Sequence, residues 1–142
     1  MKIACISDLH GNLIQYPSKY WDGLEECEVL FICGDILPLK IQHDMPRSKN
    51  WLISEFKIWA LDLPVEKVYI IAGNHDAWFE QNEAAARSIF SEHDKITYLK
   101  KPVVPCRTAG FFANFFLEGA TYEEDYFCCA SAGYGAGHVC RL

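Results

Sequence analysis

Short apolar runs separated by polar phrases dominate the first two-thirds of the chain. Three runs are nearly continuous in apolar character: Lys2–Ser7, Cys27–Cys33 and Glu66–Ala72. A strand covered on both faces has this pattern, whereas a strand with one solvated face alternates apolar and polar residues. We therefore expect three buried strands, and a fourth short one at Ile96–Leu99.

Apolar positions between these runs recur at helical spacing. The spacing predicts one helix that begins at Ser48 or Asn50 and ends near Leu61. A second helix is expected from Asp76 to about Phe90, with strong helix formers at its centre. Strands that alternate with helices indicate an α/β fold with parallel strand pairing.

The pattern weakens after Lys101. Phe111–Phe116 and Tyr126–Cys129 could form strands, but the periodicity does not assign residues 102–142. No internal repeat and no domain boundary is evident. A single domain over residues 1–142 is therefore the expectation.

Each of the three buried strands is followed directly by a polar phrase. Because parallel strands end at one edge of a sheet, these phrases should meet in space. The phrases are Ser7-Asp8-Leu9-His10-Gly11-Asn12, Gly34-Asp35 and Gly73-Asn74-His75-Asp76. Carboxylate oxygen together with imidazole suits Mn, Fe or Zn rather than a thiolate zinc site.

The spacing within the phrases suggests a role for each side chain. Asp8 and His10 lie two residues apart and would share one face of an extended chain. Asp35 follows Gly34, which permits a sharp turn, and its two oxygens could bridge two cations. Asn74 offers an amide oxygen to the second cation, and His75 is left to act on a substrate. Two cations about 3.5–4 Å apart can clamp a phosphoryl group and hold a bridging hydroxide.

Bulk composition narrows the function classes. The chain is 51% hydrophobic and 14% aromatic, as expected of a globular protein. Its net charge of −6 argues against an extended nucleic-acid surface. No apolar run approaches the roughly 20 residues that span a bilayer, and no signal-peptide pattern opens the chain, so a cytoplasmic location is expected. The seven cysteines form no Cys-x-x-Cys pair, and we expect them to be reduced.

The three phrases together resemble the calcineurin-like metallophosphoesterase family. The resemblance implies two packed mixed β-sheets flanked by helices, two divalent metal ions (Mn, Fe or Zn), and hydrolysis of a phosphomonoester or phosphodiester by a metal-activated hydroxide. The substrate would be a small phosphate ester or a nucleotide. The resemblance further implies that Asp8 and His10 bind the first metal, that Asp35 bridges the two metals, and that Asn74 binds the second. The implied catalytic residues are His75, as general acid, and Asp76, which orients its neighbours.

The chain departs from the family pattern near its end. Family members usually carry a later lone His and a closing Gly-His-x-His phrase, whereas this chain ends in Gly137-His138-Val139-Cys140. Either His138 is a further metal ligand, with Cys140 in place of the last His, or the match is coincidental. Truncation or a reading-frame change at the C-terminal end is one explanation.

Two alternatives to an active enzyme stay open at this point. The fold could serve as a weakened binding or scaffold module, because ligands to the second metal are missing. The other alternative is a nucleotide-binding α/β domain that uses no metal. The sequence specifies neither the substrate nor the oligomeric state.

Overall fold

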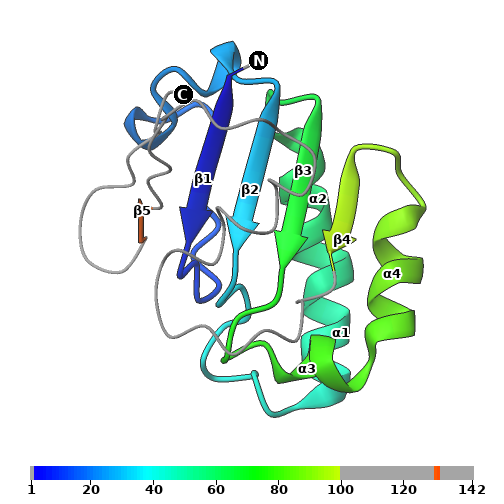
Figure 1. Ribbon diagram of the computed structural model, residues 1–142. Coiled ribbons are helices and arrows are strands. Elements are labelled where there is room, and N and C mark those ends of the chain that lie inside the picture. Colours follow the sequence, from blue (N-terminus) through cyan, green and yellow to red (C-terminus); the bar gives the residue numbers. More distant parts are fainter. Residues whose placement is uncertain (1, 100–129, 132–142) are drawn as a thin grey trace, which may run out of the picture.

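Five parallel strands form a single sheet in the computed structural model, which describes residues 2–99 and 130–131 (Figure 1). Their order across the sheet is β4-β3-β2-β1-β5. The strands are β1 (Ile3–Ser7), β2 (Val29–Cys33), β3 (Lys67–Ile71), β4 (Ile96–Leu99) and β5 (Ala130–Ser131). Because β1, β2 and β3 are parallel neighbours in the sheet, the three polar phrases that follow them lie at the same edge.

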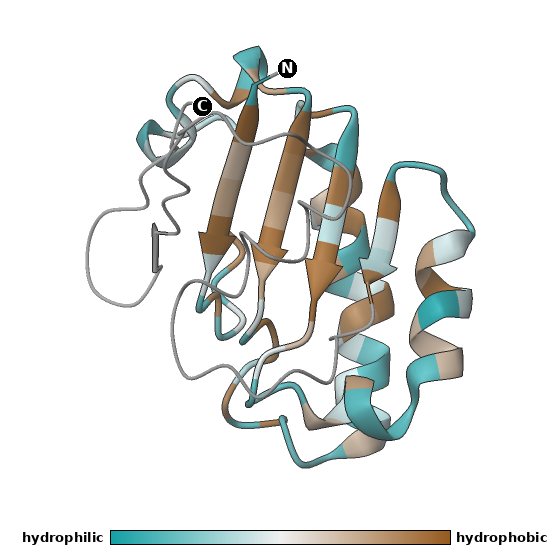
Figure 2. Cartoon of the chain, viewed as in Figure 1, coloured by the Kyte–Doolittle hydropathy of each residue, from teal (hydrophilic) through white to brown (hydrophobic). Residues whose placement is uncertain are grey.

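The continuous apolar runs are buried, as the sequence predicts. Three consecutive residues are buried in the middle of both β1 and β2, so both faces of these strands are covered. Figure 2 shows that hydrophobic residues dominate these strands, whereas the loops at their ends mix hydrophilic and hydrophobic residues. The four strands expected from the sequence are confirmed, including β4 at its predicted bounds.

Helices cover one face of the sheet (Figure 1). The first helical stretch consists of α1 (Met45–Trp51), a π-helical segment η3 (Leu52–Phe56) and α2 (Lys57–Asp62). The predicted start at Ser48 or Asn50 is wrong. Asp44 caps the helix instead, since its carboxylate accepts a hydrogen bond from the backbone N–H of Arg47 at 3.1 Å. Pro46 then fits the first turn, where no backbone N–H is needed.

The second predicted helix is divided in two, as α3 (Ala77–Gln81) and α4 (Glu83–Ser91). Asn82 makes the break. Both its backbone N–H and its side-chain amide donate to the carbonyl oxygen of Trp78, at 3.0 and 3.1 Å. A side chain that bonds the preceding turn in this way competes with helix continuation. Two short 3₁₀ turns, η1 (Lys19–Trp21) and η2 (Leu24–Glu26), complete the described helical elements.

The core between helices and sheet is rich in aromatic side chains. Phe56 from the π-helical segment packs against Trp59 and Phe90, with ring centroids 5.7 and 6.0 Å apart. Phe79 of α3 stacks on Phe90 at 6.1 Å. Trp51, Phe56 and Trp59 of the first helical stretch therefore belong to the hydrophobic core.

The parallel α/β architecture is thus confirmed, while the two-sheet sandwich stays a prediction. Residues 102–129 and 132–142, including both strands considered there and His138, lie outside the described residues. The single-domain expectation is likewise a prediction that the described residues do not test. Among the helices that the structure describes, none has the length and apolar character needed to cross a membrane.

Candidate metal centre

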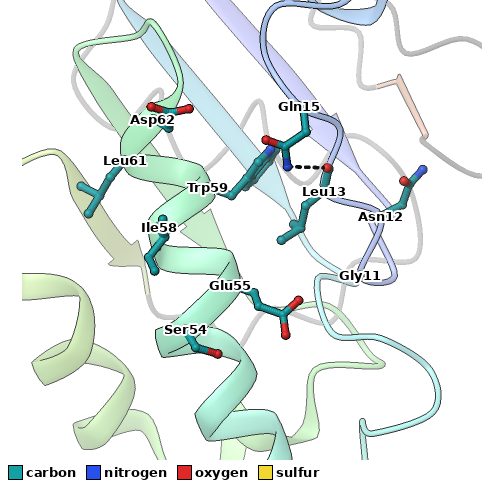
Figure 3. Close-up of a pocket in the computed structure, with 10 residues that line it drawn as sticks. All are labelled: Gly11, Asn12, Leu13, Gln15, Ser54, Glu55, Ile58, Trp59, Leu61 and Asp62. Atoms are coloured by element: carbon teal, nitrogen blue, oxygen red, sulfur yellow. Dashed lines mark hydrogen bonds between the residues drawn. The ribbon is translucent and has the colours of Figure 1, made fainter.

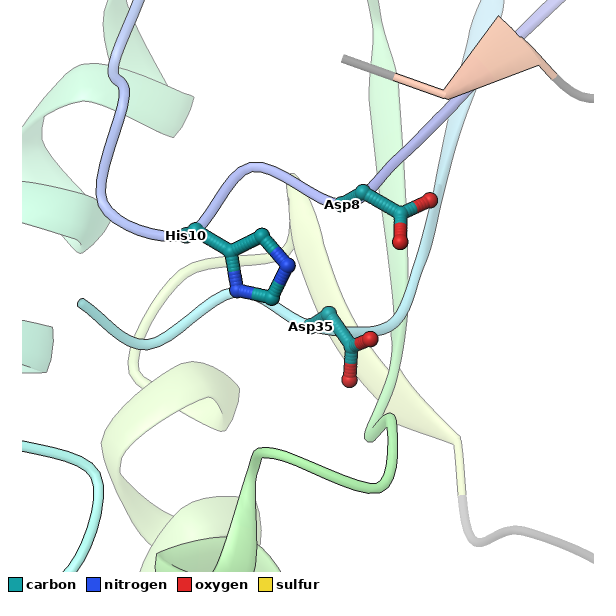
Figure 4. A group of neighbouring side chains, drawn as sticks. All are labelled: Asp8, His10 and Asp35. Atoms are coloured by element: carbon teal, nitrogen blue, oxygen red, sulfur yellow. The ribbon is translucent and has the colours of Figure 1, made fainter. Parts of the chain in front are cut away.

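Asp8, His10 and Asp35 come together at the carboxyl edge of the sheet (Figure 4). Each offers one ligand atom, and these atoms all lie within 4.8 Å of one another. Asp8 and His10 follow β1, and Asp35 follows β2, so two adjacent strands supply the group. All three residues are half-buried, which leaves the site open to solvent on one side. This is the convergence that the sequence predicts.

The backbone that presents these side chains is unusual. Asp8, His10 and Asp35 all have positive φ, at 56°, 45° and 54°. Asp and His tolerate this left-handed region better than most residues, but such a conformation still costs roughly 1–3 kcal/mol. Asp8 and His10 do come together, as expected. The reason given for it is wrong, because the backbone at these two residues is left-handed and not extended.

Backbone hydrogen bonds between the two loops hold this conformation. The N–H of Asp8 donates to the carbonyl of Gly34 at 3.1 Å, and that of His10 donates to the carbonyl of Asp35 at 2.8 Å. Gly11 continues the series by donating to Ile36 at 2.9 Å. The loops after β1 and β2 thus run side by side beyond the sheet and compensate part of the strain.

Two glycines allow the loops after β2 and β3 to approach. Gly34 has φ +96°, and a Cβ there would lie 2.7 Å from the Cα of Gly73. A Cβ on Gly73 would lie 2.1 Å from Oδ1 of Asp35. A side chain at Gly73 would displace Asp35, and one at Gly34 would push away the loop after β3. The turn that the sequence suggested for Gly34 is confirmed by its positive φ, whereas Gly73 is needed for the close approach of Asp35.

The three side chains fit a cation chemically. Asp8 and Asp35 place two carboxylates near one imidazole, and neither forms an ion pair with Lys or Arg among the residues described. Gathering like charges in this way is unfavourable unless a cation balances them. Figure 4 shows the His10 ring turned with one nitrogen toward the carboxylates. The other ring nitrogen, Nδ1, is buried and has no hydrogen-bond partner in the described part of the chain.

His75 lies against this group from the loop after β3. Its backbone N–H donates to Oδ1 of Asp35 at 3.0 Å. Its ring meets that of His10 edge to face, with centroids 5.3 Å apart and planes at 77°. Its Nδ1 lies 2.9 Å from Oε1 of Gln42. Asn74, next to His75, is exposed, and the contacts do not assign its amide to the group.

Asp76 is placed differently from its neighbours. It is fully buried, and its carboxylate accepts backbone N–H groups of Ile36 and Leu37, each at 2.9 Å, and of Gly73 at 2.8 Å. Burial raises the pKa of this carboxyl, and the charge of Asp35 adds to the rise, against the lowering effect of the three N–H groups. Asp76 thus ties the loop after β2 to the loop after β3.

Gln42 is the contact that the sequence did not indicate. It lies between β2 and α1, in a stretch of mixed polarity bounded by two prolines, and it belongs to none of the three phrases. No spacing or composition signal distinguishes it from other polar residues of this stretch. Only the fold shows that it reaches His75.

A separate groove lies between the loop after His10 and the helix α2 (Figure 3). Its volume is about 890 Å³, and Leu13, Glu55 and Ile58 are among its lining residues. Through Gly11 it borders the loop that carries His10, but it contains none of the metal-centre side chains. The groove is therefore distinct from the candidate metal centre.

Comparison with known proteins agrees with this geometry. A model of the calcineurin-like phosphoesterase family matches residues 1–135, nearly the whole chain. Searches of curated proteins and of solved structures gave no match. Members of the matched family are metal-dependent phosphoesterases, which is consistent with the Asp8, His10 and Asp35 group. The chain therefore belongs to the calcineurin-like phosphoesterase family.

Proposed function

We propose that this protein hydrolyses a small phosphate ester, a monoester or a diester, at the edge of the sheet where β1, β2 and β3 end. The observation that carries the proposal is the Asp8, His10 and Asp35 group, whose ligand atoms lie within 4.8 Å of one another. The family match supports the reaction class. A nucleotide is one candidate substrate, and the net charge of −6 favours small esters over an extended nucleic acid.

Asp8, His10 and Asp35 would hold a first divalent cation, with Mn, Fe or Zn matching their ligand atoms. Asp35 would share its second oxygen with a second cation, for which Asn74 and His138 are the proposed further ligands. When bound, such cations stabilise the negative charge that develops on phosphoryl oxygens and lower the pKa of bound water. The half-buried position of the three side chains gives a substrate access to this edge.

His75 would donate a proton to the leaving alkoxide. The carboxylate of Asp35 fixes its backbone, and the contact between its ring and His10 places it beside the cation ligands. An alkoxide is a poor leaving group without a proton, so a positioned imidazole is useful at this point. Asp76 would act as a positioning residue, because it joins the loops that carry Asp35 and His75.

We also propose a cytoplasmic location with reduced cysteines. Cys5 and Cys27 are buried in the apolar core. A cysteine in such a place packs as a small hydrophobic side chain, and disulfides are rare in cytosolic proteins.

Leaving groups of different basicity test the proposal. With Mn²⁺ present, the chain should hydrolyse both nitrophenyl and alkyl phosphate esters, and chelation should abolish both activities. His75→Ala should slow the alkyl ester by about 10²–10⁴-fold. The same variant should slow the nitrophenyl ester far less, since nitrophenolate leaves without a proton.

Asp35→Asn tests whether catalysis depends on metal binding. This variant should lose both activities together with calorimetric binding of Mn²⁺. Metal binding by the wild-type chain without hydrolysis of any ester would contradict the proposal and favour a binding module. Equal sensitivity of both esters to His75→Ala would contradict the role given to His75.

A further inference from the structure

Gln42 makes the contact with His75 that the proposed reaction has not yet used. Its Oε1 lies 2.9 Å from Nδ1 of the His75 ring. The two residues are 33 positions apart, so the contact joins the stretch before α1 to the loop after β3. We propose that Gln42 is a positioning residue, whose amide oxygen accepts the Nδ1 proton of His75 and turns Nε2 toward the reacting group. The contact between Gln42 and His75 is observed, whereas its effect on catalysis rests on the proposed function.

The choice of amide oxygen follows from what the ring must do. An imidazole that gives a proton from Nε2 carries its other proton on Nδ1. A group beside Nδ1 must then accept a hydrogen bond, and within a glutamine side chain only the carbonyl oxygen accepts. If the amide nitrogen faced Nδ1, it would hold the ring in the opposite tautomer. The contact with Oε1 is the arrangement that favours proton delivery from Nε2.

Gln42 itself is held by the backbone around it. The N–H of the preceding residue, Ile41, donates to the carbonyl of Pro38 at 3.0 Å. The carbonyl of Ile41 accepts the hydroxyl of Ser48 at 2.7 Å and the N–H of Asp44 at 2.8 Å. These bonds tie the stretch to the first turns of α1. Gln42 therefore reaches His75 from an anchored segment, as a positioning group requires.

A neutral partner suits this site. Asp8 and Asp35 already place two carboxylates near His10 and His75. An amide oxygen orients the ring of His75 without adding a third negative charge to that group. Together with the Asp35 bond to its backbone and the edge-to-face contact with His10, Gln42 gives His75 three independent points of fixation.

Three variants of the full chain test the assignment. Gln42→Met keeps the length of the side chain and removes its oxygen, Gln42→Ala removes the oxygen with the rest of the chain, and Gln42→Glu keeps an acceptor. Gln81→Met is the matched control, because Gln81 is an exposed glutamine in α3. Backbone amide NMR spectra identify which variants fold as the wild type.

The first readout is the ¹⁵N NMR spectrum of the His75 ring in metal-free protein at one fixed alkaline pH. Wild type, Gln42→Glu and Gln81→Met should show a protonated Nδ1. Gln42→Met and Gln42→Ala should shift the tautomer ratio toward a protonated Nε2. An unchanged tautomer ratio in both folded variants that lack the oxygen would overturn the proposal.

The second readout is the kinetics of an alkyl phosphate ester with Mn²⁺. Loss of one orienting hydrogen bond should lower kcat about tenfold and leave KM unchanged. Gln42→Glu should restore most of the rate. A rise in KM with kcat unchanged, or no change in either, would contradict the positioning role. Should the wild type hydrolyse no ester, the proposed function fails while the ring tautomer still decides the role of Gln42.

Discussion

Asp35 and Asp76 are two carboxylates at the same edge of the sheet, and they are set in opposite environments. Asp35 is half-buried, has φ 54°, and accepts one backbone N–H, that of His75. Asp76 is fully buried, has φ −100°, and accepts the N–H groups of Ile36, Leu37 and Gly73. The first carboxylate has oxygen lone pairs to spare, and the second has its hydrogen bonds satisfied within the protein.

This difference separates a side chain available for chemistry from one that builds the site. A strained backbone combined with unmet polar groups is unfavourable for folding alone, and such positions cluster at functional sites. A buried carboxylate that accepts several backbone N–H groups instead orders the loops around it. The comparison therefore predicts that changes at Asp35 affect ligand binding, whereas changes at Asp76 affect folding.

The largest expected effect is the loss of stability in Asp76→Ala. Removing the carboxylate leaves the buried N–H groups of Ile36 and Leu37 and the part-buried N–H of Gly73 without an acceptor, and each unsatisfied buried group costs about 1–3 kcal/mol. We expect the free energy of unfolding of metal-free protein to fall by at least about 3 kcal/mol in urea denaturation. Asp35→Asn keeps an oxygen for the His75 N–H and should change stability by no more than about 0.5 kcal/mol. Equal losses in the two variants would remove the distinction between the two residues.

The next effect is stabilisation by metal. A ligand that binds only the folded state at a concentration 100 times its Kd adds about 2.7 kcal/mol to the free energy of unfolding. Mn²⁺ should therefore raise the unfolding midpoint of the wild type, and EDTA should reverse the rise. Asp35→Asn should abolish this response. Asp22→Asn, which changes an exposed carboxylate that follows η1 and belongs to none of the three phrases, should keep it. A full response in Asp35→Asn would show that Asp35 holds no cation.

A smaller effect is expected from relief of backbone strain. Asp8 has φ 56°, where glycine is favoured, so Asp8→Gly should leave the stability of metal-free protein unchanged or raise it by up to about 1 kcal/mol. Asp22 has φ −56° and is exposed, so Asp22→Gly should lower stability by about 0.5–1 kcal/mol. Asp8→Gly should also lose metal binding in calorimetry. Destabilisation of both variants by the same amount would show that the positive φ of Asp8 stores no strain.

Features that depend on local pattern and on strand topology could be predicted from the sequence. Continuous apolar runs predict the buried strands because burial on both faces removes the usual alternation, and β4 is found at its predicted bounds. The convergence of Asp8, His10 and Asp35 follows from parallel strand topology, so their position after strands was sufficient. The family resemblance rests on these same phrases and is confirmed over residues 1–135.

Features that depend on contacts between distant loops could not be predicted. The left-handed conformation of Asp8 and His10 depends on hydrogen bonds to the loop after β2, which the local sequence does not encode. Gln42 contacts His75 across 33 positions of the chain, and no local pattern indicates that contact. The break at Asn82 likewise depends on a side-chain bond that competes with a sequence otherwise suited to one helix.

The smallest expected effect links the two carboxylates directly. The pKa of Asp76 is raised above its ordinary value of 3.8 by burial, and the charge of Asp35 raises it further. Between pH 3.8 and the higher pKa of the folded state, the unfolded chain has lost the Asp76 proton while the folded chain retains it. The folded state binds more protons in this window, so the stability that protonated Asp76 contributes at low pH is lost as the pH rises through it.

Neutralising Asp35 should narrow that window. In Asp35→Asn the repulsion between the two carboxylates is absent, so the pKa of Asp76 should fall toward 3.8 while its burial still holds it higher. A ¹³C NMR titration of side-chain carboxyl groups in metal-free protein measures the shift. Asp22→Asn, which removes an exposed charge, should leave the titration of Asp76 unchanged. If Asp35→Asn also left it unchanged, the two carboxylates would not interact, and the buried one could be treated as part of the scaffold alone. A fall in the pKa would show that the structural carboxylate responds to the charge of the residue that is proposed to hold the metal.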